Sequence, residues 1–213
     1  MKKCQLAIKR AFDVVVSLLM IIFLTIIPVL IVVPIAIKLT SAGPAVFKQE
    51  RVGKDGKIFK IYKFRTMRNP PKGTYSVNGV LYKPNGELLE PSSTRITKVG
   101  AFLRKTSLDE LMQLFNILEG TMSFVGSRPS LPYQAEKYTA EQRRRLEMKP
   151  GMTGWAQVNG RNNLTWTEKI KYDVEYVDRF SLLFDLKIMF KTVGVVLKRD
   201  KIEFEKEDSL TKK

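Results

Sequence analysis

Two adjacent carboxylates, Asp109 and Glu110, lie in the stretch Arg104-Lys-Thr-Ser-Leu-Asp-Glu-Leu-Met-Gln-Leu-Phe-Asn116. Ser107 and Glu110 have capping-box spacing, which predicts that Ser107 caps a helix and that both acids occupy its first turn. Because the positive end of a helix dipole favours negative charge, a purely structural role is one interpretation. In the other, Asp109 is held ionised beside Arg104 and binds Mg²⁺ or attacks a phosphorus atom, as aspartyl-phosphate enzymes do.

Two loops rich in glycine carry further candidate groups. Arg128 lies in Ser123-Phe-Val-Gly-Ser-Arg-Pro129, where Gly126 permits close backbone approach and Pro129 fixes the exit. Such an arginine either supports a phosphate site around Asp109 or is simply a surface residue. The loop at 150–162 either approaches a nucleotide or sugar through its backbone or is a tight connection with Trp155 in the core.

The composition excludes several kinds of chemistry. The 213 residues include no His and one Cys, which rules out Ser-His-Asp or Cys-His systems, His- or Cys-based zinc sites and an intrachain disulfide. A metal would need oxygen ligands, as Mg²⁺, Mn²⁺ and Ca²⁺ do. The formal net charge of +16 indicates anionic partners, namely nucleic acid, a membrane surface or phosphorylated small molecules.

The uncharged run from Val14 to Ile37 predicts a membrane segment. As a helix it would reach about 36 Å, against a hydrocarbon core of about 30 Å, and it is too long for the apolar region of a signal peptide. Pro28 near its middle and basic residues on both flanks favour a bent segment that enters and leaves on the cytoplasmic side. A kinked spanning helix is the alternative. A basic domain beside a membrane favours lipid head groups and lipid-linked phosphates over nucleic acid.

The rest of the chain predicts one α+β domain that is mostly helical. Two short strands are expected between Phe47 and Met67, and the face carrying Lys57, Lys63 and Arg65 is either solvated or directed at phosphate. Residues 69–93 are expected to be irregular. Turn signals at Asn78-Gly79 and Asn85-Gly86 are consistent there with a short hairpin.

Helices are predicted from Thr97 onwards. Capping boxes at Thr139-x-x-Gln142 and Thr165-x-x-Glu168 mark two helix starts, and the second helix buries Trp166, Ile170, Val174 and Val177. The amphipathic stretch 184–197 either lies in a membrane interface or caps the core. The arginines Arg143, Arg144 and Arg145 are expected to form a solvated helix face, with anionic lipid as the second interpretation.

Six ordered motifs resemble the bacterial sugar transferase family, whose members are monotopic phosphoglycosyl transferases. The resemblance covers the chain from about Lys9 to Thr192 and indicates the small, minimal form of the family. The motifs are Phe47-x-Gln49-x-Arg51-x-Gly53, Lys63-Phe-Arg-Thr-Met67, Ser107-Leu-Asp-Glu-Leu111, Val125-Gly-x-Arg-Pro129, Pro150-Gly-x-Thr-Gly-Trp-Ala-Gln-Val-Asn-Gly-Arg-Asn162 and Asp173-x-x-Tyr-Val177.

The resemblance implies transfer of a sugar 1-phosphate from a UDP-sugar to polyprenol (undecaprenyl) phosphate, with release of UMP. This would be the first membrane step in making a bacterial capsule, O-antigen, exopolysaccharide or glycoprotein glycan. It further implies a monotopic protein on the cytoplasmic face of the inner membrane, with a re-entrant helix at 1–40, a catalytic domain at 41–200 and a flexible tail at 201–213. Anionic lipid, downstream glycosyltransferases and a second copy of the chain are the other expected partners, and nucleic acid is not.

The resemblance also implies roles for individual residues. Asp109 would attack the phosphorus bonded to the sugar, and Asp109 and Glu110 would hold Mg²⁺, for which Mn²⁺ can substitute. The expected phosphate-binding residues are Lys63, Arg65, Arg104 and Arg128. The candidate nucleotide or sugar contacts are Gln49, Thr153, Asn159, Arg161 and Asn162.

Four positions depart from the family pattern. Ile27 replaces the serine that precedes Pro28, so a side-chain hydrogen bond at the membrane break is missing. Met112, Thr121 and Ser127 replace a proline, an aspartate and a proline respectively. Because none of these changes removes the acidic pair or Arg128, the catalytic assignment survives them. The competing hypothesis is a non-enzymatic basic protein that binds anionic lipid or lipid-linked phosphates at the membrane surface.

Overall fold

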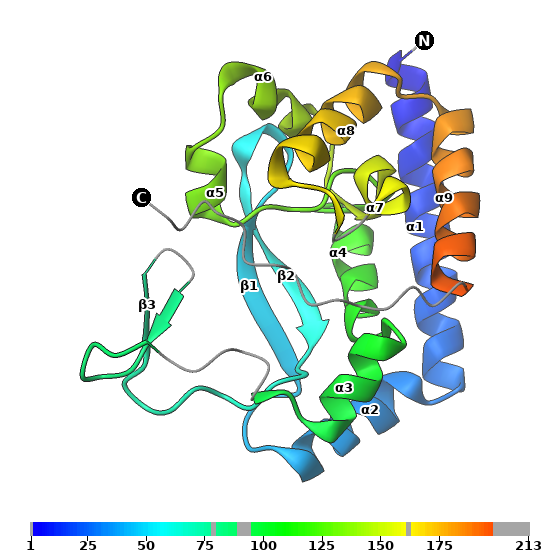
Figure 1. The fold of residues 1–213 in the computed structure, drawn as a ribbon. Helices are drawn as coiled ribbons and strands as arrows, with labels where there is room; N and C mark the ends of the chain where they lie inside the picture. The colour runs from blue at the N-terminus through cyan, green and yellow to red at the C-terminus, as the bar shows by residue number, and fades with distance from the viewer. Residues whose placement is uncertain (1, 78–79, 89–94, 161–162, 198–213) are drawn as a thin grey trace. The chain divides into compact units, whose positions relative to one another are not determined.

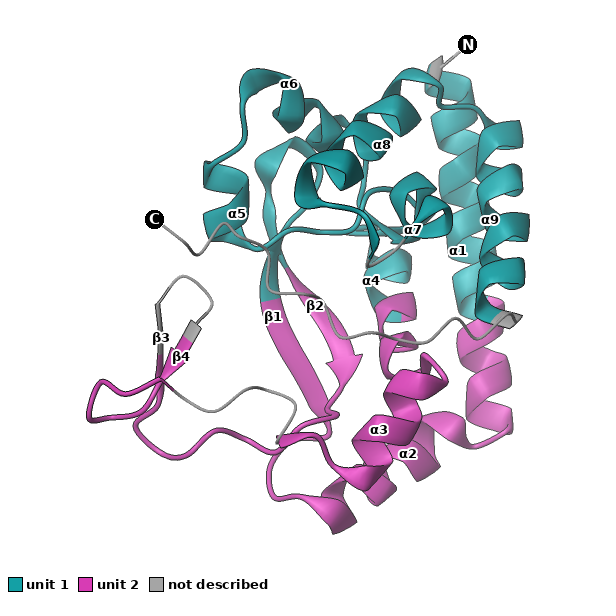
Figure 2. Ribbon diagram, viewed as in Figure 1, with its two compact units in different colours: residues 1–18, 50–59, 115–213 teal, residues 19–49, 60–114 magenta. Residues whose placement is uncertain are grey.

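The structure is a computed structural model that describes residues 2–77, 80–88, 95–160 and 163–197. The chain divides into two compact units (Figure 2). The first unit comprises residues 1–18, 50–59 and 115–213, and the second comprises 19–49 and 60–114. The predicted tail, the Asn78-Gly79 turn, Arg161 and Asn162 lie outside the described residues.

The apolar N-terminal run forms two helices, α1 (Lys2–Ile26) and α2 (Val29–Thr40) (Figure 1). They are separated at Pro28, which confirms the predicted break, whereas α2 continues through Pro34. Within the described part of the chain, neither helix by itself has the length and apolar character to cross a membrane. The segments Lys3–Ile26 and Val29–Thr40 meet that test together, with a bend of 63° at the break.

The strands form three two-stranded sheets in the described residues. Strands β1 (Val46–Val52) and β2 (Ile58–Phe64) pair with each other and are connected by a one-turn helix, η1 (Lys54–Gly56), as the sequence predicted. Strands β3 (Tyr75–Val77) and β4 (Val80–Tyr82) are antiparallel, which confirms the short hairpin.

A parallel pair, β5 (Ser123–Val125) and β6 (Gly151–Thr153), belongs to the first unit. These two strands are short, and Val125 on β5 is almost completely buried. They end next to the two glycine-rich loops identified in the sequence, so this small sheet positions both loops.

Helices make up most of the remaining structure, in agreement with the predicted mostly helical α+β class. The capping boxes at Thr139 and Thr165 are both present. The helices from residue 97 onwards are α3 (Lys98–Lys105), η3 (Leu108–Glu110), α4 (Gln113–Glu119), α5 (Pro132–Glu136), α6 (Ala140–Arg143), η4 (Arg144–Glu147), α7 (Trp155–Asn159), α8 (Trp166–Asp178) and α9 (Leu182–Leu197).

Each unit has its own apolar core. In the first unit Ile170, Val174 and Val177 of α8 are buried as predicted, and Trp155 is also a core residue. Trp166 is partly buried and packs against the cluster that contains Ile170 and Val174. In the second unit Ile37, Ala45, Phe64 and Leu103 form the core, and Leu108, Leu111 and Met112 around the acidic pair pack against it.

The prediction of a solvated arginine face at 143–145 is wrong for one of its three members. Arg143 is exposed and Arg144 pairs with surface acids, but Arg145 has only 3% of its area exposed. It forms a buried ion pair with Asp173, which lies 28 positions away in the sequence. A partner so distant leaves no signal in the local charge pattern.

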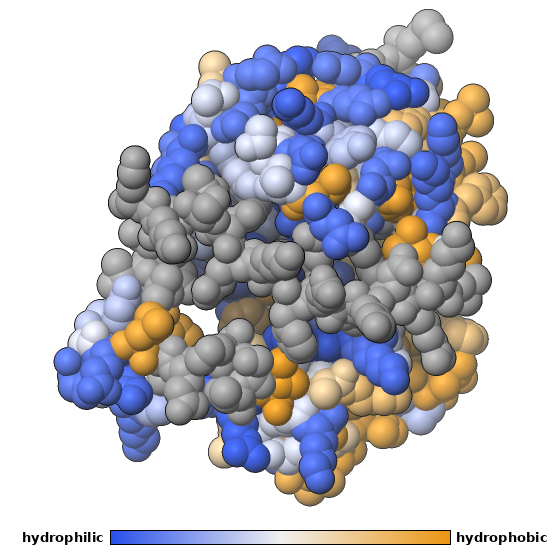
Figure 3. Space-filling model, in the orientation of Figure 1, coloured by the Kyte–Doolittle hydropathy of each residue, from blue (hydrophilic) through white to orange (hydrophobic). Residues whose placement is uncertain are grey.

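Helix α9 both covers the core and exposes an apolar stripe. Phe184 and Ile188 are buried, whereas the outward face carries Leu183, Leu186, Phe190 and Val193. Figure 3 shows apolar side chains gathered along this edge of the first unit. The buried face of α9 therefore packs on the core, as one of the two interpretations predicted. The exposed apolar stripe is consistent with the other interpretation, in which the helix contacts a membrane interface.

Candidate active site

The acidic pair lies on a single helical turn, η3, between α3 and α4. The predicted cap at Ser107 is wrong, because Ser107 adopts a left-handed conformation with φ of 56° and its side chain makes no capping hydrogen bond. This residue ends the preceding helix, since its N–H donates to the carbonyl of Arg104. An N-cap residue normally has extended backbone dihedrals, which Ser107 does not have.

Helix α3 positions Arg104 against the end of β2. Thr97 caps this helix through a hydrogen bond from Gly100 N–H, as the predicted helix start requires. A Cβ atom on Gly100 would overlap the backbone of Thr66, so the glycine allows close approach. As a result Arg104 Nε donates to Thr66 Oγ1 at 2.9 Å.

Lys63 on β2 forms an ion pair with Glu110, with 2.7 Å between Nζ and Oε1. Both side chains are about one-fifth exposed, so the pair lies near the surface without being fully solvated. The structure therefore brings four predicted site residues together in the second unit, namely Lys63, Arg104, Asp109 and Glu110.

Arg65 donates its hydrogen bonds to a different part of the second unit. Its guanidinium is buried and donates to the backbone carbonyls of Ser41 and Ala42, just after α2. A Cβ on Gly43 would collide with the same guanidinium. The solvated interpretation of this strand face is thus wrong for Arg65, and its predicted phosphate contact stays a prediction.

The pKa of Asp109 is raised from its ordinary value of 3.8 to about 6, mainly by burial and then by the neighbouring Glu110 carboxylate, which together outweigh the lowering effect of Lys63 and Arg104. Arg104 lowers the pKa of Asp109, as its position beside the acid predicted, but burial has the larger effect. At neutral pH the carboxylate is still mostly ionised. Its oxygen is more basic than that of an ordinary aspartate, which favours attack on phosphorus.

The Asp109→Asn variant should be more stable than the wild type at neutral pH. The folded state holds the Asp109 proton more tightly than the unfolded chain, so ionisation costs stability as the pH rises from about 4 to about 6. The variant should gain up to about 3 kcal/mol in the free energy of unfolding near pH 8, and almost nothing near pH 3. Denaturant unfolding at both pH values measures this difference, and an equal gain at both would contradict the assigned pKa.

The donor set around Asp109 suits a hard divalent cation that shares its ligands with substrate. Within the described residues, no group of three or more Asp, Glu, His or Cys side chains could hold a metal. Two adjacent carboxylates, however, match the way Mg²⁺ binds through one or two acids plus phosphate oxygens and water. The residues present therefore fit such an ion when a diphosphate is bound.

The loop that carries Arg128 belongs to the first unit and is held by backbone hydrogen bonds. Residues 125–130 are all buried except Arg128, which is exposed. Gly126 N–H donates to the carbonyl of Thr153 at 2.9 Å, and Gly151 N–H donates to that of Ser127 at the same distance. A Cβ on Gly126 would overlap the backbone of Lys149, which confirms the predicted close backbone approach.

Two predicted sugar contacts make hydrogen bonds within the first unit. Thr153 Oγ1 lies 2.7 Å from Thr192 Oγ1, and Asn159 donates to the carbonyl of Trp155. Asn159 also accepts a hydrogen bond from Lys191. Gln49 lies on β1, in the second unit. No contact in the structure tests a sugar-binding role for these residues, and that role stays a prediction.

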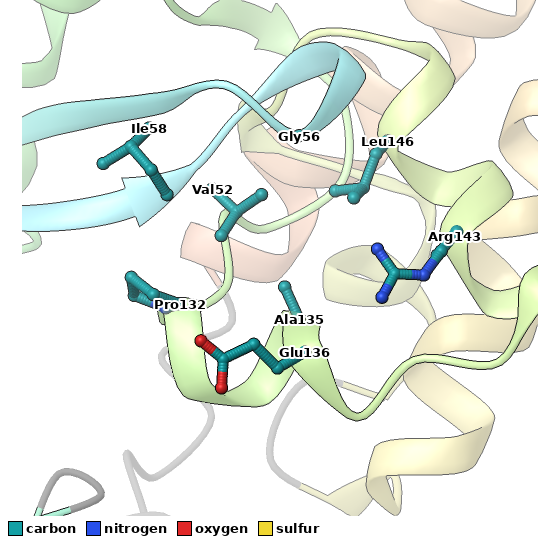
Figure 4. Close-up of a pocket in the computed structure, with 8 residues that line it drawn as sticks. All are labelled: Val52, Gly56, Ile58, Pro132, Ala135, Glu136, Arg143 and Leu146. Atoms are coloured by element: carbon teal, nitrogen blue, oxygen red, sulfur yellow. The ribbon is translucent and has the colours of Figure 1, made fainter.

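One small cavity of about 180 Å³ also lies in the first unit (Figure 4). Its walls are largely apolar, and Glu136 and Arg143 supply its charged groups. None of the predicted site residues that the structure describes lines it, and we do not assign it to the substrates. The full set of lining residues is Val52, Gly56, Ile58, Pro132, Ala135, Glu136, Arg143 and Leu146.

Comparison with known sequences identifies the class of protein that carries this site. Residues 4–199 match the sequence profile named bacterial sugar transferase. The chain therefore belongs to the bacterial sugar transferase family.

Three relatives illustrate the range of sizes. The "Uncharacterized sugar transferase EpsL" of Bacillus subtilis is 42% identical over 92% of this chain and 90% of its own length. The Escherichia coli "UDP-glucose:undecaprenyl-phosphate glucose-1-phosphate transferase" is 42% identical over 87% of this chain, and the Streptococcus agalactiae "Galactosyl transferase CpsE" is 40% identical over 92%. The chain spans only 39% and 43% of the length of those two relatives.

Proposed function

We propose that this protein transfers a sugar 1-phosphate from a UDP-sugar to a polyprenol phosphate such as undecaprenyl phosphate. The observation that carries the proposal is the half-buried Asp109, whose pKa is raised to about 6 and which lies beside the cations of Lys63 and Arg104. A basic carboxylate next to positive charge suits attack on an anionic phosphorus centre. The names of relatives such as the Escherichia coli enzyme support the same substrate classes.

In the proposed first step a carboxylate oxygen of Asp109 attacks the phosphorus that is bonded to the sugar. An aspartyl O–P bond forms, the P–O bond to the uridine phosphate breaks, and UMP leaves with that electron pair. In the second step an oxygen of polyprenol phosphate attacks the same phosphorus. The aspartyl bond then breaks, so the free carboxylate is restored and polyprenol-diphosphate-sugar is the product.

The neighbouring residues stabilise charge during both steps. Lys63 and Arg104 lower the pKa of Asp109, so their positive charges act on its carboxylate. The same charges would stabilise negative charge on the diphosphate as its P–O bond breaks. Lys63 also fixes the carboxylate of Glu110 through their 2.7 Å ion pair.

We further propose that Asp109 and Glu110 hold Mg²⁺ together with oxygens of the bound diphosphate. When bound, this ion would neutralise phosphate charge in the reacting group. Two carboxylates and no third acidic ligand within the described residues fit an ion that completes its shell from substrate and water.

The proposed setting is the cytoplasmic face of the bacterial inner membrane. The bend of 63° at Pro28 supports an N-terminal segment that enters one leaflet and returns. The apolar stripe of α9 supports a second contact with the interface. Such an arrangement would bring a soluble donor and a lipid phosphate acceptor to the same depth, so neither substrate would need to cross the bilayer.

Metal removal tests the proposed reaction. Purified protein incubated with undecaprenyl phosphate and a panel of UDP-glucose, UDP-galactose and their N-acetyl forms should release UMP with at least one donor. EDTA should lower that release by about 10²-fold or more, and Mg²⁺ or Mn²⁺ should restore it. Zinc or calcium added after EDTA is the control for a general ionic effect. Liposome binding without UMP release from any donor would favour a non-enzymatic lipid-binding protein instead.

A further inference from the structure

Arg145 has a deeply buried guanidinium in the first unit, only 3% exposed. It donates to Asp173 at 2.5 Å and to Ser130 Oγ at 2.5 Å, and it also donates to the hydroxyl of Tyr138. The guanidinium carbon lies 5.4 Å and 5.7 Å from the ring centroids of Tyr138 and Trp166. A buried ion pair adds little stability over apolar side chains of similar size. A gain in stability therefore does not explain why an arginine is buried at this position.

A further hydrogen bond of this guanidinium goes to the backbone carbonyl of Arg128, at 2.9 Å. The next two carbonyls of the same loop are also held. That of Pro129 accepts from Arg51 at 3.1 Å, and that of Ser130 accepts a backbone hydrogen bond from strand β1. Three consecutive carbonyls are thus fixed around the one loop residue whose side chain is exposed.

We propose that Arg145 is a positioning residue that acts through Arg128. By fixing the backbone at Arg128, it directs the exposed side chain of that residue toward one orientation, in which it can bind the diphosphate of the donor. Such preorganisation lowers the cost of ordering a long side chain when substrate binds. The inference rests on the proposed function, because it needs a phosphate ligand for Arg128.

The chemistry of the contacts requires an arginine at this position. One terminal nitrogen of Arg145 donates to Ser130 and Tyr138, and the other donates to Asp173 and Arg128. A lysine ammonium is a compact charge that cannot reach all four acceptors at once. Arg145→Lys should therefore keep the charge balance with Asp173 and lose the bond to the Arg128 carbonyl.

A double-mutant cycle tests this role in the full chain, with UMP release as the assay. Arg145→Lys should lower kcat/KM for the UDP-sugar about tenfold or more when Arg128 is present. In an Arg128→Ala background the same substitution should change it less than about twofold. Ile170→Val, a core change on the same helix as Asp173, is the matched control and should have an equal small effect in both backgrounds.

Equal losses from Arg145→Lys in the two backgrounds would overturn the proposal, since they would indicate a purely structural role. Wild-type kcat/KM in a folded Arg145→Lys protein would also overturn it. If that variant does not fold, Tyr138→Phe is judged by the same criterion, because it removes one hydrogen bond from the guanidinium and the hydroxyl's own hydrogen bond to Ser130 in the Arg128 loop. A wild type that releases no UMP overturns the proposed function and this inference together, whereas an active wild type with equal losses overturns only the positioning role.

Discussion

Asp109→Asn should lower the rate of UMP release by about 10³-fold or more while the protein stays folded. The amide has almost the same shape as the carboxylate but cannot donate an electron pair to phosphorus as an anion. The loss should appear in kcat, because the reacting oxygen acts only in the chemical step. Initial rates at saturating donor and acceptor measure it, and unfolding near pH 8 checks that the variant is at least as stable as the wild type.

The matched control is Asp55→Asn. Asp55 is an exposed acid on η1, with φ of 55°, a conformation that asparagine also tolerates. The substitution makes the same chemical change away from the acidic pair and should keep wild-type turnover. Full activity in Asp109→Asn, or an equal loss in both variants, would contradict the assignment of Asp109 as the nucleophile.

Lys63→Met should lower kcat by about 10²-fold and shift the acid limb of the pH–rate profile to higher pH. Lys63 is the cation that most strongly lowers the pKa of Asp109, so its loss should move that pKa above its value of about 6. The nucleophile would then be deprotonated only at higher pH. The variant also leaves Glu110 without the lysine that fixes its carboxylate at 2.7 Å.

Lys72→Met is the control for the loss of one positive charge, because Lys72 is exposed in the turn before β3. It should leave both kcat and the acid limb unchanged. A Lys63→Met protein whose rate falls while its pH profile stays in place would show that Lys63 acts on the substrate alone. That result would contradict the electrostatic coupling to Asp109.

Features that depend on neighbours in the sequence were predictable. Thr97, Thr139 and Thr165 begin helices because each hydroxyl needs only an N–H three residues later. The helix break at Pro28 follows from the missing backbone donor of proline. The one close backbone approach predicted for a glycine, at Gly126, also follows from local chemistry.

The features that the sequence did not reveal depend on partners far away along the chain. Ser107 matches a capping box in the sequence. In the structure it adopts a left-handed conformation at the end of the preceding helix, and its side chain does not cap the next one. The local sequence predicts a surface position for Arg145, whereas in the folded protein it forms a buried ion pair with Asp173. Lys9 likewise reads as a membrane flank, whereas it is buried in an ion pair with Asp185.

The electrostatics of the site could not be obtained from residue types either. Arg104, five positions before Asp109, suggested an acid held in its ionised form, since opposite charges favour ionisation. Burial outweighs that attraction and raises the pKa of Asp109. The balance depends on how much water reaches the carboxylate, and only the folded packing of η3 determines that.

Mass spectrometry of the half-reaction determines whether Asp109 becomes covalently modified by the donor. The protein is mixed with an active UDP-sugar and Mg²⁺ in the absence of polyprenol phosphate, quenched and digested. We expect the peptide containing Asp109 to gain the mass of one phosphosugar. The corresponding peptide of Asp109→Asn should gain none, and addition of undecaprenyl phosphate should remove the adduct from the wild type. Turnover-competent protein whose Asp109 peptide never carries this mass, or an adduct on another peptide, would contradict this expectation.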